Sequence, residues 1–150
     1  MKIRLTAAWL LLCLLFSFSS FGASADTTIY QVSGDYDYLP LADGTISLAK
    51  YYGSDEDLTV PAELDGHPVS MIADGAFSWN NDLVNVTFSE GIVSMGSGLF
   101  AYSTFLESVT FPSSLREIGY NPFIGCDSLE AIHVSADHPL LEVKDNVLFN

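Results

Sequence analysis

The chain has 150 residues, of which 49% are hydrophobic, and its net charge at pH 7 is −14. Because acids in such excess repel nucleic-acid phosphates and anionic lipid headgroups, we expect neither nucleic-acid binding nor peripheral membrane binding. The length is enough for one domain and too short for two.

The first 25 residues have the three parts of a secretory signal peptide. Lys2 and Arg4 make a basic start, residues 5–21 are mainly apolar, and residues 23–25 read Ala-Ser-Ala, the small residues that a signal peptidase accepts. The purely apolar part is too short to cross a bilayer as an anchor. We therefore expect cleavage before Asp26, an extracytoplasmic protein that is secreted or held at the cell surface, and no membrane insertion after cleavage.

Cleavage at that point changes the charge and the cysteine content of the chain. Three basic residues then face 19 acids, a net charge of −16. Cys126 is the one cysteine left, so the expected mature chain has no internal disulfide. Packing alone would stabilise it outside the cell.

Residues 26–57 are expected to form an amino-terminal β lead-in. Segments 28–32 and 44–48 alternate in polarity and are rich in β-forming residues, and the stretch from Pro40 to Gly44 is typical of a turn. This predicts a short hairpin-like structure. Such a structure would cap the open end of a stack, where apolar side chains and strand edges would otherwise be wet.

Residues 58–150 repeat themselves. Apolar side chains recur at a spacing of 23 residues, which is the signature of a stacked-repeat solenoid. The predicted repeats lie near 58–82, 83–105, 106–128 and 129–150. The matched residues are Leu83, Leu106 and Leu129; Val86, Val109 and Ile132; Phe88, Phe111 and Val134; Ile92 and Leu115; Met95 and Ile118; and Phe100 and Phe123.

Each regular repeat is too short for two long helices. Its start alternates as a strand with one buried face, and a turn follows. The fold class we predict is therefore a β-rich repeat solenoid with short parallel strands, turns and brief helical arcs. The first repeat is longer by five residues around Asp65-Gly66-His67-Pro68, which we expect to bulge out as a loop because a stacked core cannot absorb an insertion.

The repeats resemble BspA-like leucine-rich repeats of bacterial surface and secreted proteins. Residues 106–129 carry the resemblance best, with a Leu-x-x-Val-x-Phe-Pro strand, an Ile-Gly turn and a Phe-x-x-Cys segment. Ala76-Phe77 keeps the family's Ala-Phe element, and the cysteine slot holds Asn80, Ser103 and Cys126. The resemblance covers residues 30–150. It implies a non-enzymatic, secreted or cell-surface module for protein binding or adhesion, with partners among host, matrix or neighbouring-cell proteins.

A structural role is the alternative function. Members of the family usually carry more repeats, and the segment 138–150 drops the period and ends on an apolar run. This favours a repeat spacer, or a truncated fragment of a longer surface protein, with no ligand of its own. The oligomeric state stays open.

No catalytic, cofactor-binding or metal-binding residues are predicted. The cysteine slot is better explained by small polar side chains that bond unpaired backbone groups of the bend. The three histidines, His67, His133 and His138, lack metal-ligand spacing. The acidic run at 55–57 is typical of a solvated loop. An enzyme is therefore not expected.

The outward side chains of the predicted strands are the candidate partner-binding face. They would stack in rows across a parallel sheet, where an extended protein or peptide ligand fits. The competing interpretation, of equal weight, is that they are solvent-facing residues of good β-propensity. Trp79, Tyr102 and Tyr120 beside the core are interpreted mainly as local packing. The candidate face consists of Asn85, Thr87, Ser108, Thr110 and His133.

Overall fold

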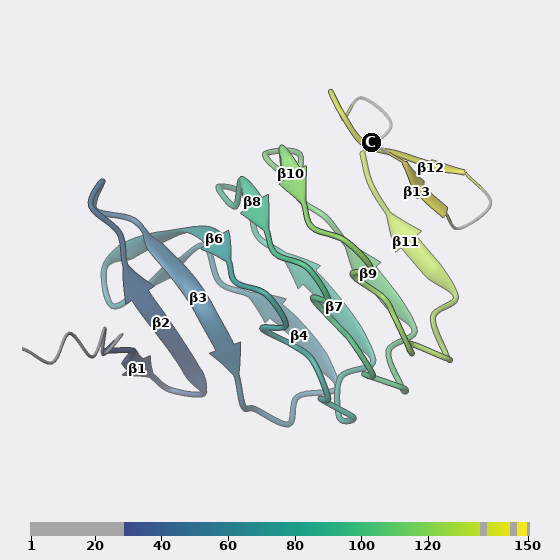
Figure 1. Ribbon diagram of the computed structural model, residues 1–150, viewed down its shortest axis with the longest axis horizontal. Coiled ribbons are helices and arrows are strands. Elements are labelled where there is room, and N and C mark those ends of the chain that lie inside the picture. Colours follow the sequence, from purple (N-terminus) through teal and green to yellow (C-terminus); the bar gives the residue numbers. More distant parts are fainter. Residues whose placement is uncertain (1–28, 136–137, 145–146, 150) are drawn as a thin grey trace, which may run out of the picture.

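The computed structural model describes residues 29–135, 138–144 and 147–149. The predicted signal peptide, residues 1–25, lies outside the described residues and stays a prediction. Figure 1 shows the chain winding into a stack of similar turns. The strands are β1 Gln31–Ser33, β2 Tyr36–Pro40, β3 Ile46–Tyr51, β4 Asp57–Val60, β5 Glu63–Leu64, β6 His67–Ile72, β7 Asn85–Phe88, β8 Ser94–Met95, β9 Ser108–Thr110, β10 Glu117–Ile118, β11 Ala131–His133, β12 Glu142–Lys144 and β13 Val147–Phe149.

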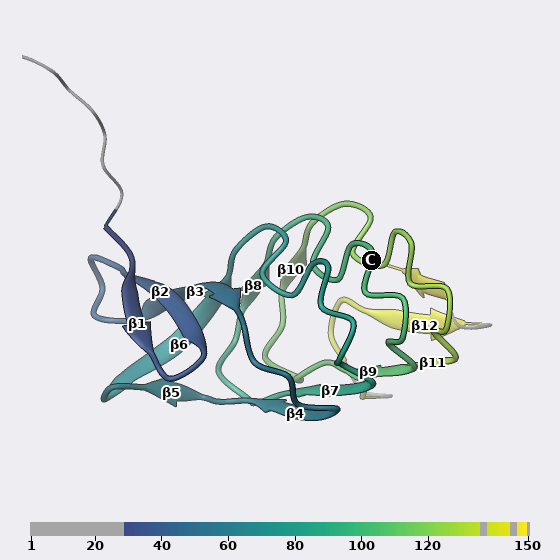
Figure 2. The same ribbon diagram turned by 90° about the horizontal axis from the view of Figure 1, so that it is seen from below.

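Two sheets enclose the core. The first, here called the strand-face sheet, has the order β11-β9-β7-β4, and all its neighbours are parallel. The second, here called the mixed sheet, has the order β1-β2-β3-β6-β8-β10, with β5 paired to β6. Figure 2 shows the strand-face sheet as one layer, with the turns arching over the opposite side. Strands β12 and β13 form a separate antiparallel pair.

The register confirms the predicted repeat. In the strand-face sheet Asn85 pairs with Ser108 and Ser108 with Ala131, each 23 positions apart. The mixed sheet repeats the same step, because Ser94 pairs with Glu117. A parallel ladder with this period is a β-solenoid, as the alternating pattern and the repeat length predicted.

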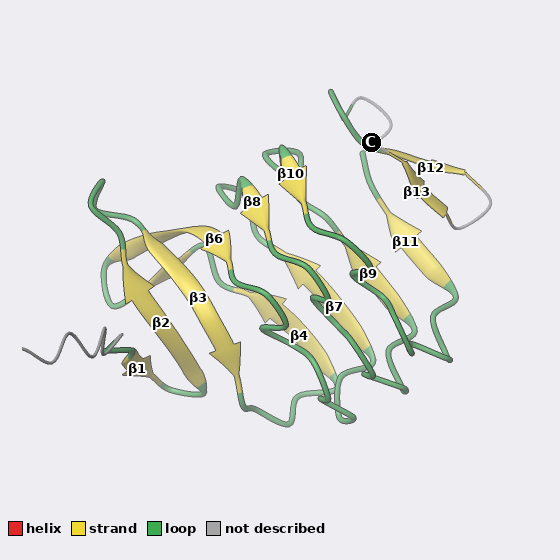
Figure 3. Ribbon diagram, viewed as in Figure 1, coloured by secondary structure: helices red, strands yellow, loops and turns green. Residues whose placement is uncertain are grey.

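The turns contain no helix within the described residues, so the predicted helical arcs are wrong in detail (Figure 3). The backbone explains the difference. Each arc carries two residues of positive φ, four positions apart, as at Gly98 and Tyr102, both at 60°. Left-handed residues end a right-handed helix, so isolated turns with i to i−3 bonds, such as Ala101 N–H to Gly98 O at 2.9 Å, replace it.

The insertion in the first repeat is an ordered hairpin rather than an irregular loop. Strand β5 pairs antiparallel with the start of β6, and Asp65 and Gly66 form a two-residue turn with φ values of 51° and 81°. Positive φ at both residues is what a type I′ turn requires, and Asp-Gly is one of its preferred sequences. The side chain of Asp65 accepts hydrogen bonds from Ser33 at 2.8 Å and from Tyr38 at 2.9 Å, so the hairpin is tied to the first strands.

The amino-terminal segment has three antiparallel strands where a hairpin of two was expected. Strand β2 lies between the two predicted strands and pairs with both β1 and β3. Strand β3 then runs parallel to β6 and extends the mixed sheet beyond the repeats. Its side chains Ile46 and Leu48 are fully buried, so this segment completes the amino-terminal end of the core.

Phenylalanine columns fill the core. Phe77 stacks on Phe100 with ring centroids 5.3 Å apart, and Phe100 stacks on Phe123 at 5.9 Å. A second column pairs Phe88 with Phe111 at 5.9 Å. Edge contacts join the columns, as between Phe88 and Phe100 at 6.1 Å. Each repeat therefore buries its largest side chains in large part against the neighbouring repeats, which makes the repeats depend on one another.

Candidate partner-binding face

The candidate face is the outer surface of the strand-face sheet. Its strands alternate strictly: in β7, Asn85 and Thr87 are exposed while Val86 and Phe88 are buried. Successive side chains of a strand point to opposite faces of the sheet. When the apolar side chains are buried, the polar side chains between them must therefore point outward. The same burial that builds the core therefore positions the candidate residues.

The parallel register brings all five predicted residues onto one surface. Neighbouring strands lie about 4.8 Å apart, so side chains at paired positions stand in rows across the sheet. Two rows result, one on each outward position of the strands. The first row is Asp57, Asn85, Ser108 and Ala131, and the second is Thr59, Thr87, Thr110 and His133.

Hydrogen bonds connect the first row. The Ser108 hydroxyl donates to Asn85 Oδ1 at 2.5 Å, and the Asn85 amide donates through Nδ2 to Asp57 Oδ1 at 2.7 Å. Each such bond contributes only about 1 kcal/mol to stability. Their effect on shape is greater, because they hold three neighbouring side chains in one orientation before any partner arrives.

Two residues of the face were missed in the sequence. Asp57 and Thr59 lie on β4, which pairs with β7 at an offset of 28 positions, seen in the pairing of Asp57 with Asn85. The inserted hairpin accounts for the five positions beyond the usual 23. Placing the hairpin after Val60 and aligning Leu58 with Val86 would have found both residues.

The cysteine slot has the structural role that the sequence indicated. Ser103 is fully buried and its hydroxyl donates to the carbonyl of Phe77 at 2.8 Å. One repeat further on, Cys126 Sγ donates to the carbonyl of Phe100 at 3.0 Å. Burial raises the pKa of the Cys126 thiol to about 11, so the thiol is protonated at neutral pH. A nucleophilic thiolate needs the opposite shift.

The histidines lie in separate places. His67 Nδ1 is 3.3 Å from the carbonyl of Gly44, and His138 Nδ1 accepts the backbone N–H groups of Leu140 and Leu141. His133 is exposed at the end of the second row. In the part of the chain that the structure describes, no three His, Cys, Asp or Glu side chains gather as metal ligands would.

The fold is a parallel β-solenoid with a repeat of 23 residues. Phenylalanines stack in its core, and small polar side chains lie inside the bend. This is the architecture of a leucine-rich repeat protein. The chain belongs to the BspA-type leucine-rich repeat family. The family model described as "BspA type Leucine rich repeat region (6 copies)" matches residues 57–150.

Two solved structures are similar to the chain. A leucine-rich cell surface protein from Faecalibacterium prausnitzii A2-165 is 29% identical with a TM-score of 0.64, over 73% of this chain and 31% of that one. A leucine-rich repeat protein of T. pallidum is 28% identical with a TM-score of 0.65, over 71% of this chain and 50% of that one. The chain thus spans half or less of the length of both.

No curated protein matches the chain. Among the described residues, none forms a helix with the length and apolar character needed to cross a membrane.

Proposed function

We propose that this chain is a non-enzymatic, extracytoplasmic protein-interaction module, secreted or displayed at the cell surface, that acts in adhesion. Its partners would be host, matrix or neighbouring-cell proteins. Membership of the BspA-type family supports the interaction role, and the similar F. prausnitzii protein is named a cell surface protein. The basic, apolar and small-residue order of residues 1–25 supports export.

The main observation behind the proposal is the regular arrangement of side chains on the strand face. Asn85, Thr87, Ser108, Thr110 and His133 form regular rows on a rigid sheet, and the bonds from Ser108 to Asn85 and from Asn85 to Asp57 fix part of it. A rigid array of polar groups binds an extended polypeptide with little loss of conformational entropy, because its own side chains are already ordered.

The test combines a panel of proteins with a triple variant. The full chain is measured by surface plasmon resonance against purified extracellular-matrix and host-cell surface proteins. Changing Thr87, Thr110 and His133 together to alanine is expected to weaken binding about tenfold or more, as loss of a central group of contacts does.

A matched triple variant provides the control. Met71, Ser94 and Glu117 pair in register across β6, β8 and β10 of the mixed sheet. Their joint change to alanine should leave both binding and the urea midpoint unchanged. Equal loss in the two triple variants, or unchanged binding in the strand-face variant, would contradict the strand face as the binding surface.

A structural spacer is the second candidate function. The chain spans only 31% and 50% of the two similar structures, so its repeats would then hold other parts of a longer surface protein in place. Absence of binding to every protein of the panel would favour this function over adhesion.

A further inference from the structure

The aromatic pair Trp79 and Tyr102 lies outside the strand face and is exposed. Trp79 is 68% exposed and Tyr102 43%, although the sequence had indicated local packing for both. Their rings stack on each other, with centroids 4.4 Å apart and an interplanar angle of 24°. One face of the Trp79 indole is thus covered by Tyr102, and the exposure of the side chain comes from the rest of the ring. We call this pair the aromatic edge.

The backbone under the aromatic edge is in an unusual conformation. Trp79 and Tyr102 both have a φ of 60°, a left-handed region that bulky side chains rarely adopt. The equivalent residue of the next repeat is Gly125, with a φ of 72°. The fold therefore accepts glycine at this position, and the two aromatic side chains are present at a cost to the backbone. Strain of this kind is concentrated at functional sites.

Surrounding bonds hold the strained turn in place. Lys50 Nζ donates to the carbonyls of Gly75 and Ser78 at 3.0 and 2.8 Å. The Trp79 N–H donates to the carbonyl of Ala101 at 2.9 Å. Tyr102 in turn lies so close to Gly125 that a Cβ there would stand 2.6 Å from the tyrosine Cδ1. The glycine leaves room for the tyrosine ring, and the tyrosine supports the indole.

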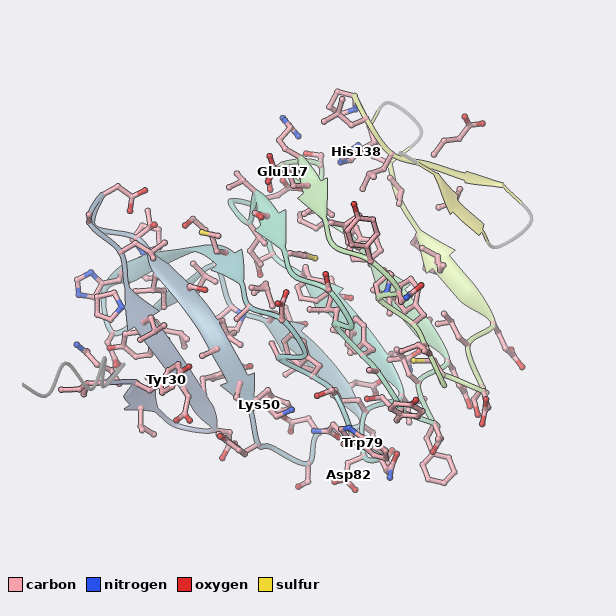
Figure 4. All side chains as sticks on the ribbon, in the orientation of Figure 1. Tyr30, Lys50, Trp79, Asp82, Glu117 and His138 are labelled. Carbon is pink, nitrogen blue, oxygen red and sulfur yellow. The ribbon has the colours of Figure 1, made fainter. Side chains whose placement is uncertain are left out.

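One carboxylate lies beside this edge. Figure 4 shows Trp79 and Asp82 together at one border of the molecule, with Lys50 nearby. Asp82 is exposed, and within the described residues its carboxylate has no hydrogen bond or ion pair. The Lys50 ammonium is occupied by the oxygens of the Gly75–Ser78 turn. These oxygens are uncharged, so Lys50 remains a cation near the edge. A cationic partner is favoured there by the Asp82 carboxylate and by the net charge of −14 of the whole chain.

We propose that the aromatic edge recognises an arginine side chain presented by a protein partner. The guanidinium lies on the face of the Trp79 indole that Tyr102 does not cover, and the Asp82 carboxylate balances its charge. Arginine combines a planar cation that stacks on aromatic rings with donors that suit carboxylates. A neutral sugar also stacks on tryptophan, but it would gain no electrostatic attraction from Asp82 or from the net negative charge of the chain. This surface is separate from the strand face and does not depend on its function.

The experiment uses the full chain with Trp9 changed to phenylalanine, so that fluorescence reports on Trp79 alone. The probe is a short peptide of alternating arginine and glycine. It should quench or shift the emission, and binding should weaken as salt rises. The same peptide with citrulline in place of arginine should bind about tenfold more weakly, since it keeps the shape and loses the charge.

Variants then test the residues by calorimetry. Trp79→Gly should weaken peptide binding about tenfold while the melting temperature stays at or above that of the parent, because glycine suits the positive φ. Trp79→Asn is the second variant, since asparagine also tolerates this region. Asp82→Asn should weaken binding about threefold. The control, Tyr120→Ala, removes a ring that is 86% exposed and should change binding less than twofold.

Three results would overturn the proposal. Trp79→Gly or Trp79→Asn could bind the arginine peptide as the parent does. The citrulline peptide could bind as well as the arginine peptide. A neutral glucan oligosaccharide could bind in a way that requires Trp79 while the arginine peptide does not bind. The strand-face triple variant should leave peptide binding unchanged, so failure here and failure of the proposed adhesion surface are distinguishable.

Discussion

Changing Phe100 to alanine is expected to lower the free energy of unfolding by about 3–5 kcal/mol, the usual cost of removing a buried phenylalanine ring. Phe100 is fully buried and contacts the rings of Phe77, Phe88 and Phe123, so it connects the two columns. Since small domains have a total stability of about 5–15 kcal/mol, this variant should lose a large part of it. Urea unfolding followed by far-ultraviolet circular dichroism measures the change.

Phe105→Ala is the matched control for that prediction. Phe105 is five positions further on and 58% exposed, so its removal should change the urea midpoint little. If the two variants unfold at the same urea concentration, the phenylalanine columns do not hold the repeats together.

Changing Gly96 to alanine is expected to lower the free energy of unfolding by about 3 kcal/mol, at the upper end of the usual overpacking cost. A Cβ at Gly96 would stand 2.5 Å from the backbone nitrogen of Asp74 and 2.7 Å from the carbonyl carbon of Ala73. These are backbone atoms of the preceding repeat, which cannot rotate away. The two turns would have to separate, and the midpoint of urea unfolding should fall accordingly.

Gly98→Ala separates this steric effect from backbone conformation. Gly98 lies two positions on, has a φ of 60°, and a Cβ there would meet only the Ala101 side chain at 3.7 Å. Its replacement should cost about 1 kcal/mol, the penalty for a side chain at positive φ. Equal losses at Gly96 and Gly98 would show that close contact between repeats is not what Gly96 provides.

The sequence predicted the repeated part of the fold well, because the period determines the register. Once Val86 and Val109 occupy equivalent buried positions, Thr87 and Thr110 must stand side by side outside. The spacing alone therefore placed the five candidate residues on one surface, while partner binding by that surface stays a prediction. The candidate face was incomplete at β4, where the hairpin changes the offset to 28 and hides the match between Asp57 and Asn85.

Features outside the period were harder to predict. Strand β2 carries Asp37 among its tyrosines, and its pairing depends on contacts with β1 and β3 that no local pattern reveals. The helical arcs failed because Trp79 and Tyr102 adopt a positive φ that neither residue prefers. Tertiary hydrogen bonds between repeats, such as Tyr102 N–H to Ile124 O at 2.7 Å, override the local preference there.

The aromatic edge could not be predicted from the sequence either. That Trp79, Tyr102 and Gly125 are equivalent follows from the period, and the glycine indicates a left-handed backbone at this position. The stacking of the two rings and their exposure depend on how the side chains lie across neighbouring turns. Only the three-dimensional arrangement shows that.

The most direct test of the stacked-repeat account is urea unfolding of the full chain, with Trp9 changed to phenylalanine, followed by two probes at once. Circular dichroism reports on the strands of both sheets, and fluorescence reports on Trp79 in the turn between β6 and β7. We expect one cooperative transition with the same midpoint for both probes, because the phenylalanine rings of each repeat stack on those of its neighbours. Transitions at two separate urea concentrations would show that the repeats do not form one core and would contradict the account.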